Sequence, residues 1–299
     1  MDRILFGDNQ FFGVNHMSEE KARQQLIRFQ PMDAILNVLQ SALHAGVRGF
    51  SCTTHDRMAE VAAAVRADPA KWDGFYFCPG MPYAHKYANA VTEHGYFDAL
   101  KQVLPNDGIV SAIMRGGKAL VTRDVETLIT MLVDAEMKMF AGLPTPIIFL
   151  QNVVTDLVLG VGYYDAFRIF AEHVKAKYNA EAGFFTMNLP MLLPALESVG
   201  VTNPIVCANV NKVGFRMSGG IEGYRKALEQ RPARVIAMSV LASGAIRPRE
   251  AIEWVTGEPY VKSILFGASS AGNIRSTVEL IHEYDAKRGI AAPQLEPAA

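Results

Sequence analysis

Cysteine, net charge and long apolar runs are all scarce in this sequence. The three cysteines, Cys52, Cys78 and Cys207, are odd in number and widely spaced, so we expect reduced thiols and no Cys-x-x-Cys zinc or redox motif. A formal net charge of -1 gives no general attraction to nucleic acid or to an anionic membrane. No stretch reaches the roughly 18 uninterrupted apolar residues of a membrane span, and the N-terminal residues lack a signal-peptide pattern. We expect a cytoplasmic protein with a small-molecule partner; homo-oligomerisation stays open.

Short apolar runs alternate with amphipathic stretches along the whole chain, a pattern typical of parallel strands linked by helices. Eight such runs suit a closed barrel. We therefore predict an α/β protein, a (β/α)8 TIM barrel with residues 1–299 as a single domain. The candidate strands lie near residues 4–6, 47–52, 74–78, 146–152, 183–188, 204–209, 233–239 and 261–267. The helices expected between them include residues 32–45, 58–67, 164–178, 192–199, 220–230 and 271–286.

One connection, residues 80–145 between the third and fourth expected strands, is much longer than a helix and two turns require. We interpret it as an extended crossover over the barrel mouth. It would begin with a loop over residues 80–95 and continue as helices near 96–104, 107–119 and 123–140, with Ile109 to Met114 as an alternative extra strand. A smaller insertion, Asn15 to Gln30, follows the first strand.

Polar side chains follow the apolar part of nearly every expected strand. In a TIM barrel the loops after the strands carry the active site, so these residues should converge at the mouth. The set is rich in amides and hydroxyls, which suits a sugar-like or carbonyl-bearing ligand, although an asparagine after a strand is also a common turn former or helix cap. The predicted substrate-binding residues are Asn9, Gln10, His16, Cys78, Gln151, Asn152, Asn188, Asn209 and Asn211.

Asp8, His55 and Asp56 are the predicted catalytic residues. An imidazole titrates near working pH, and a neighbouring carboxylate could orient or charge it. The alternative is that Asp56 caps the helix that begins near Met58. A metal site made from these three residues and His16 lacks the spacing of a compact site, so no metal is expected. For Cys78, the alternative to a ligand contact is a small buried side chain.

The last two expected strands lead into turns that suit an anion. Gly267, Ser269 and Ser270 precede a helix whose first backbone N–H groups would attract a phosphate of the substrate or a cofactor, although a serine there is also an ordinary helix cap. Phosphate binding in the last loops is frequent in TIM barrels. The predicted cofactor- or phosphate-binding residues are Ser239, Gly267, Ser269, Ser270, Asn273 and Arg275.

Several segments together resemble the aldo-keto reductase family of barrels. They are LFGDNQFFG, AGVRGFSCTTHDRMAEV, and LASGAIRPREAIEWV followed by VKSILFGASSAGNIRSTVEL. The resemblance implies a barrel of reductase type, but that family works with an Asp, Tyr, Lys and His tetrad. Ser51 stands at the Asp position, no Tyr follows in the second loop, Cys78-Pro79 stands at the Lys position, and Gln151-Asn152 stands at the His position.

Three functions remain open on this basis. The first is an isomerase or lyase that uses acid/base chemistry on a small polar, sugar-like or phosphorylated carbonyl compound. The second is a divergent NAD(P)-dependent oxidoreductase that has rebuilt its proton donor from His55. The third is a noncatalytic barrel that binds a metabolite. The cofactor stays unassigned, with NAD(P) as the candidate.

Overall fold

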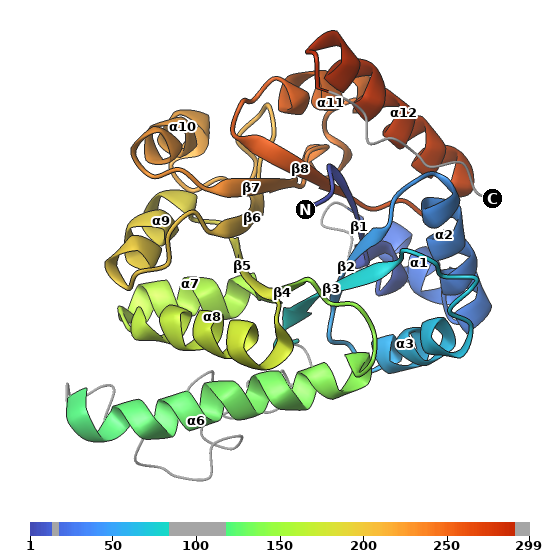
Figure 1. Cartoon of the computed structure of the whole chain (residues 1–299). Helices are drawn as coiled ribbons and strands as arrows, with labels where there is room; N and C mark the ends of the chain where they lie inside the picture. Colours follow the sequence, from blue (N-terminus) through green and yellow to red (C-terminus); the bar gives the residue numbers. More distant parts are fainter. Residues whose placement is uncertain (14–17, 84–117, 291–299) are drawn as a thin grey trace.

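A computed structural model describes residues 1–13, 18–83 and 118–290 of the chain. Eight parallel strands close into one barrel, in which each strand pairs with its sequence neighbours and β8 pairs back with β1 (Figure 1). The predicted TIM barrel is confirmed. The strands are β1 (Ile4–Gly7), β2 (Gly49–Thr53), β3 (Tyr76–Met81), β4 (Ile147–Leu150), β5 (Glu181–Thr186), β6 (Ile205–Asn209), β7 (Arg234–Met238) and β8 (Val261–Phe266).

Helices surround these strands (Figure 1). The helices and short 3-10 turns are η1 (Asn9–Phe11), α1 (Glu19–Arg28), α2 (Met32–His44), α3 (Arg57–Ala67), α6 (Lys118–Met137), η3 (Lys138–Phe140), α7 (Asn152–Val161), α8 (Asp165–Tyr178), α9 (Leu189–Ser198), α10 (Gly220–Gln230), η4 (Ala242–Gly244), α11 (Pro248–Thr256) and α12 (Ala271–Lys287). Prolines mark two helix starts, because Pro31 immediately precedes α2 and Pro248 is the first residue of α11.

Helix α7 is not among the helices expected from the sequence. Polar residues Asn152, Thr155 and Asp156 recur on one face of this helix, and that helical spacing was the available signal. The helix ends at Gly162, whose φ of 73° lies in the left-handed region that glycine adopts without strain. Only a short turn separates α7 from α8, so both helices lie between β4 and β5.

The long connection between β3 and β4 contains α6 and η3, which correspond to the helix predicted near 123–140. Asp134 fastens α6 to α8: its carboxylate accepts hydrogen bonds from Lys177 Nζ at 2.6 Å and Tyr178 OH at 2.6 Å, and lies 2.8 Å from His173 Nε2. The predicted helix at 96–104, the alternative strand Ile109–Met114 and most of the predicted loop and of the helix at 107–119 fall outside the described residues.

The barrel interior is a packed core and not a channel. Its buried cluster consists of Leu5, Cys78, Ile147, Phe149, Ile205, Cys207 and Ile236. Two glycines make room for large neighbours, because a Cβ at Gly183 would overlap the Phe149 ring and a Cβ at Gly49 would overlap Leu5 and Tyr76. Since the interior is full, ligands have access only at an end of the barrel.

Cys78 belongs to this interior, and its predicted place at the end of the third strand is wrong. β3 continues through Pro79 and Gly80 to Met81, and both residues stay in register with β2. The predicted strand stopped too early because proline and glycine usually mark turns. Cys78 is fully buried in the barrel interior, and burial raises the pKa of its thiol, so the alternative of a small buried core side chain applies.

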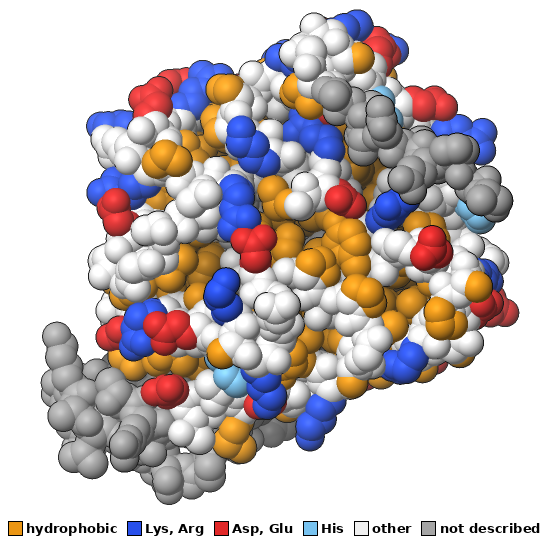
Figure 2. Space-filling view, in the orientation of Figure 1, with side chains coloured by type: hydrophobic (Ala, Val, Ile, Leu, Met, Phe, Trp, Pro, Cys, Tyr) orange, Lys and Arg blue, Asp and Glu red, His pale blue; other side chains and the backbone are white. Residues whose placement is uncertain are grey.

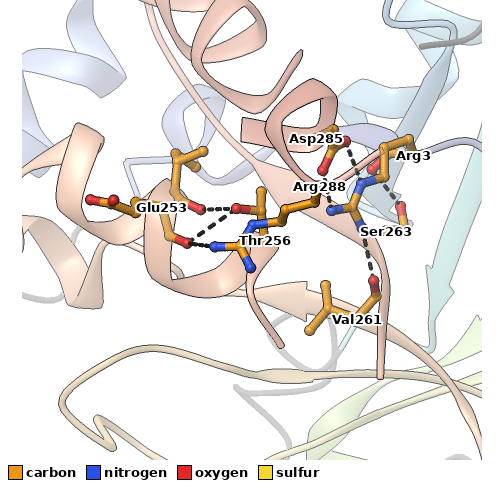
Figure 3. Close-up of polar contacts among 8 residues, drawn as sticks. Arg3, Glu253, Thr256, Val261, Ser263, Asp285 and Arg288 are labelled. Atoms are coloured by element: carbon orange, nitrogen blue, oxygen red, sulfur yellow. Dashed lines mark hydrogen bonds and ion pairs between the residues drawn. The ribbon is translucent and has the colours of Figure 1, made fainter. Parts of the chain in front are cut away.

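Arg3 and Asp285 fasten the first strand to the last helix (Figure 3). The guanidinium donates from Nε and Nη2 to the two carboxylate oxygens at 2.8 and 2.7 Å, and from Nη1 to the Val261 carbonyl at 2.8 Å. Ser263 on β8 adds a hydrogen bond to the Asp2 carbonyl at 2.7 Å. These contacts join β1, β8 and α12 where the barrel closes.

Charged side chains of both signs are interspersed over the face shown in Figure 2, with apolar side chains between them in the middle of that face. This agrees with the near-zero net charge of the chain. Within residues 1–13, 18–83 and 118–290, no helix combines the length and the apolar character needed to cross a bilayer.

Removing the Asp285 carboxylate should destabilise the fold. Its side chain is only 3% exposed and that of Arg3 12%, so Asp285→Ala leaves a largely buried guanidinium without its partner. Loss of one member of a buried ion pair costs about 3–5 kcal/mol, which urea unfolding would measure as a lower midpoint. Glu283→Ala on the same helix is the matched control, because that carboxylate is exposed and its loss should have a much smaller effect. Equal effects of the two variants would contradict this account.

Candidate active site

Asp8 lies at the mouth of the barrel, directly after β1. Its Oδ2 accepts hydrogen bonds from the Thr53 backbone N–H at 2.7 Å and from Thr53 Oγ1 at 2.8 Å, so the ends of β1 and β2 are joined here. The residue is 6% exposed. Burial raises the pKa of this carboxyl above its ordinary value, and the two bonds from Thr53 offset only part of the rise. Asp8 can therefore hold a proton at a higher pH than an ordinary aspartate.

His55, two residues after β2, is held on several sides. Phe12 stacks on its ring at 4.2 Å with 16° between the planes, and the Tyr83 ring lies 5.2 Å away. The Arg57 backbone N–H donates to His55 Nδ1 at 3.1 Å. A nitrogen that accepts this bond carries no proton, so the neutral ring has its proton on Nε2 and can donate from there.

Asp56 stands at the cap position of α3, but its side chain makes no capping hydrogen bond. The alternative that Asp56 caps this helix is therefore wrong. His55 takes that place through its bond from the Arg57 N–H. Asp56 is exposed at the rim, beside His55 in sequence and close enough to affect Tyr83 electrostatically.

Tyr83 is a site residue that the sequence analysis missed. It follows β3 after a Met81-Pro82 step with a cis peptide bond, and it is half-buried beside His55. Burial raises the pKa of its phenol, and the negative charges of Asp8 and Asp56 raise it further. The sequence could have indicated this residue, because a tyrosine just after a strand lies at the barrel mouth. It was overlooked because the third strand was expected to end at Cys78.

The amides predicted to bind substrate divide into two groups. Gln10, Asn209 and Asn211 are buried and bonded to their own chain: Gln10 Nε2 donates to the Gly7 carbonyl, Asn209 Nδ2 to the Arg216 carbonyl, and Asn211 Nδ2 to the Phe215 carbonyl. These three therefore shape loops, contrary to the prediction that they contact substrate. The amides that remain at least partly exposed at strand ends are Asn9, Gln151, Asn152 and Asn188.

Asn188 is placed by a short relay that the sequence did not reveal. Thr186 Oγ1 at the end of β5 donates to Asp156 Oδ1 at 2.6 Å and accepts from the Asn188 backbone N–H at 2.8 Å. Asp156 Oδ2 also accepts from the Met187 N–H at 3.2 Å. The Asn188 side chain then caps α9 by accepting from the Met191 N–H at 3.4 Å. The predicted alternative of a helix cap thus applies to Asn188.

The loops after β7 and β8 lie next to the β1 end around the mouth, since β8 pairs with β1, and they contain no carboxylate. Residues 239–247 and 267–275 have no Asp or Glu and one arginine each, Arg247 and Arg275. Ser270 caps α12 by accepting a hydrogen bond from the Asn273 N–H, so the alternative of an ordinary helix cap applies to it. Ser269 and Ser239 are half-buried. Gly267 lies against Gln10, which links these loops to the β1 end. Backbone N–H groups, hydroxyls and guanidinium groups suit a phosphate-bearing ligand.

No group of three or more His, Cys, Asp or Glu in the described part of the chain is placed to hold a metal ion. His16, predicted as a substrate contact and considered as a metal ligand, lies outside the described residues. Tyr83 lies beside His55 and within electrostatic range of Asp8 and of the exposed Asp56.

The fold and site define a TIM barrel with titratable side chains after β1 to β3 and acid-free loops after β7 and β8. Comparison with solved structures makes this more specific: the barrel has the fold of aldo-keto reductases. The deep-sea metagenome enzyme MGS-M4 aligns with a TM-score of 0.57 and 12% identity, covering 97% of this chain and 91% of that one. At 10% identity and a TM-score of 0.55, the enzyme from Brucella melitensis covers 97% of this chain and 95% of its own.

A third match is an aldo-keto reductase from Bombyx mori solved in complex with NADP, with a TM-score of 0.55, 10% identity, and coverage of 97% of this chain and 89% of that one. No family model and no curated protein matches the sequence. At these identities the likeness establishes the fold.

The raised pKa of Asp8 predicts a specific pH dependence of stability. The folded protein binds the Asp8 proton more tightly than the unfolded chain, whose aspartates titrate near pH ~3.9. The free energy of unfolding should therefore fall as pH rises from about 4 through the folded pKa of Asp8. Urea unfolding of the wild type and Asp8→Asn across this range would isolate the effect, with Asp165→Asn, an exposed aspartate, as control. A wild-type minus Asp8→Asn difference that rises with pH would contradict the assignment.

Proposed function

We propose that this protein is an NAD(P)-dependent oxidoreductase that reduces a small carbonyl compound. The observation that carries the proposal is the division of the mouth. Asp8, His55 and Tyr83 gather at the ends of β1, β2 and β3, while the acid-free loops 239–247 and 267–275 lie at the ends of β7 and β8. The reductase fold over nearly the whole chain supports it.

The donors of the two loops fit the phosphates of a dinucleotide. Ser239, Ser269, the first turn of α12 and the guanidinium groups of Arg247 and Arg275 would hold phosphate oxygens, and neither loop itself contains a carboxylate. At the barrel end, Phe185, Met238 and Leu265 are partly buried side chains that pack on the interior cluster. They offer an apolar surface for a flat ring. A bound nicotinamide would supply a hydride to the carbonyl carbon.

The proton for the carbonyl oxygen would come from Asp8. Its raised pKa lets it hold a proton nearer to working pH and release it as negative charge develops on that oxygen. His55, with its proton on Nε2, would donate a hydrogen bond to the same oxygen and fix its position. Tyr83 is a weaker acid than an ordinary tyrosine, because its pKa is raised, so it would serve as a hydrogen-bond donor and not as the proton source.

A second candidate is an isomerase or lyase that uses the same groups without a nicotinamide. The raised pKa of Asp8 favours it, because a carboxylate tuned toward neutral pH is also a good general base beside a carbonyl. Gln151, Asn152 and Asn188 would hold polar groups of a sugar-like or phosphorylated substrate in either reaction. A noncatalytic metabolite-binding barrel would share the binding groups but show no turnover.

Cofactor binding separates these candidates. Titration of the protein with NADPH and NADH, followed by quenching of protein fluorescence, should give saturable binding with at least one of them. Binding of neither at millimolar concentration would favour the cofactor-free isomerase or lyase. Binding without turnover of any carbonyl compound would favour the noncatalytic reading.

Replacing His55 should stop the reaction without unfolding the barrel. His55→Phe keeps a flat ring against Phe12 and removes the Nε2 donor, so it should lower kcat/KM for carbonyl reduction by about 10²-fold or more. The control is His44→Phe, because His44 is exposed at the end of α2, away from the mouth. Melting curves of both variants would establish that they fold. Full activity of His55→Phe would remove His55 from the mechanism.

A further inference from the structure

The loop between β6 and α10 is built to hold one residue, Arg216, in place. Asn209 Nδ2 donates to the Arg216 carbonyl at 3.0 Å. Asn211 holds the preceding residue at both ends, because its Nδ2 donates to the Phe215 carbonyl at 2.9 Å and its Oδ1 accepts from the Phe215 N–H at 2.8 Å. Both asparagines are buried, at 2% and 0% exposure, so these bonds are shielded from water.

Arg216 has a backbone conformation that an arginine rarely adopts. Its φ is 53°, in the left-handed region where a side chain with a Cβ is strained. Glycine or asparagine would fit this position at lower cost. Such strain persists only where the surroundings enforce it, here through Asn209 and Asn211. The loop therefore keeps an arginine at a place where the backbone alone would favour another residue.

The Arg216 guanidinium is exposed and stands over the Phe215 ring, 5.4 Å from its centre. Within the residues that the structure describes, no carboxylate forms an ion pair with it. Phe215 in turn packs against the small buried cluster of Ala242, Ile246 and Ala251. The Arg216 guanidinium therefore lies over a ring that packs against the β7–α11 loop, which is one of the two acid-free loops.

The β7–α11 loop carries complementary features. Ser239, Ala242 and Ser243 also have positive φ, at 55°, 46° and 58°. The backbone N–H groups of Ala242, Gly244, Ala245 and Ile246 donate to carbonyls inside this loop, so its serine hydroxyls and Arg247 are the donors that it offers an anion. Arg247 is the last residue of the loop. The nearest acid in α11, Glu250, forms an ion pair with Lys212 of the β6–α10 loop, with 2.7 Å between Oε1 and Nζ. The positive charge of Arg216 next to this loop is therefore not neutralised by an acid of the loop itself.

We propose that Arg216 binds a phosphate group that lies on the β7–α11 loop, and that Asn209 and Asn211 are positioning residues for it. The identity of the ligand, a nicotinamide dinucleotide, rests on the proposed function. The phosphate contact of Arg216 does not, since any phosphate or pyrophosphate would be bound in the same way. The planar guanidinium offers two parallel N–H donors to phosphate oxygens, and its cation–π contact with the Phe215 ring restricts where it lies.

Equilibrium binding to the full chain tests the proposal without turnover. Arg216→Gln keeps the length and polarity of the side chain and removes its charge, and Arg216→Lys keeps the charge without the fork. NADPH and NADH are titrated by fluorescence, and inorganic pyrophosphate by calorimetry. We expect Arg216→Gln to weaken binding of the dinucleotide and of pyrophosphate by about 10-fold or more, and Arg216→Lys to have an intermediate effect. Arg168→Gln on the exposed face of α8 is the control and should bind as the wild type does.

The outcomes separate this proposal from the proposed function. If a dinucleotide binds to the wild type and equally well to Arg216→Gln, the role of Arg216 is overturned while the oxidoreductase proposal stands. If neither dinucleotide binds, the oxidoreductase proposal fails, and pyrophosphate decides: binding that is lost in Arg216→Gln supports a phosphate site for another ligand, and no binding overturns it. Equal weakening in Arg168→Gln would mean a general charge effect and would also overturn it.

Discussion

The rest of the structure depends on the closure of eight strands into a ring whose inside is completely filled. Gly49 and Gly183 exist as glycines because Tyr76 and Phe149 occupy the space where their side chains would be. A filled interior leaves no room for reactive groups along the strands, so chemistry is confined to the residues that follow them. Asp8, His55 and Tyr83 occur within a few residues of a strand end for this reason.

Much of the fold could be predicted from the sequence, because all eight strands are short apolar runs separated by helical stretches. The ends of the strands were harder to predict where the local turn propensity of the sequence conflicts with strand pairing in the barrel. Pro79 and Gly80 have turn propensity, yet pairing with β2 keeps both in β3. Because the third strand was expected to end at Cys78, that residue was wrongly predicted at the mouth and Tyr83 was not recognised as a site residue. Tertiary pairing overrides local propensity, and a single sequence does not display it.

The sequence predicted where the candidate site residues lie better than it predicted which groups they contact. Asp8 and His55 were correctly expected at strand ends, but their partners depend on contacts across the fold, such as the Phe12 ring on His55. Asn209 and Asn211 have the chemistry of ligand-binding amides, and only the structure reveals that both serve their own loop. The sequence supplies the donors and acceptors, whereas burial decides which of them face a ligand.

The contact between Arg3 and Asp285 has a consequence for how the chain is made. These residues are 282 positions apart, so during synthesis on the ribosome β1 is complete long before β8 and α12 exist. Until then one edge of β1 has no partner, and its backbone groups are open to wrong pairing. The barrel can therefore close only after β8 has been made, and until then the nascent chain carries the open edge of β1.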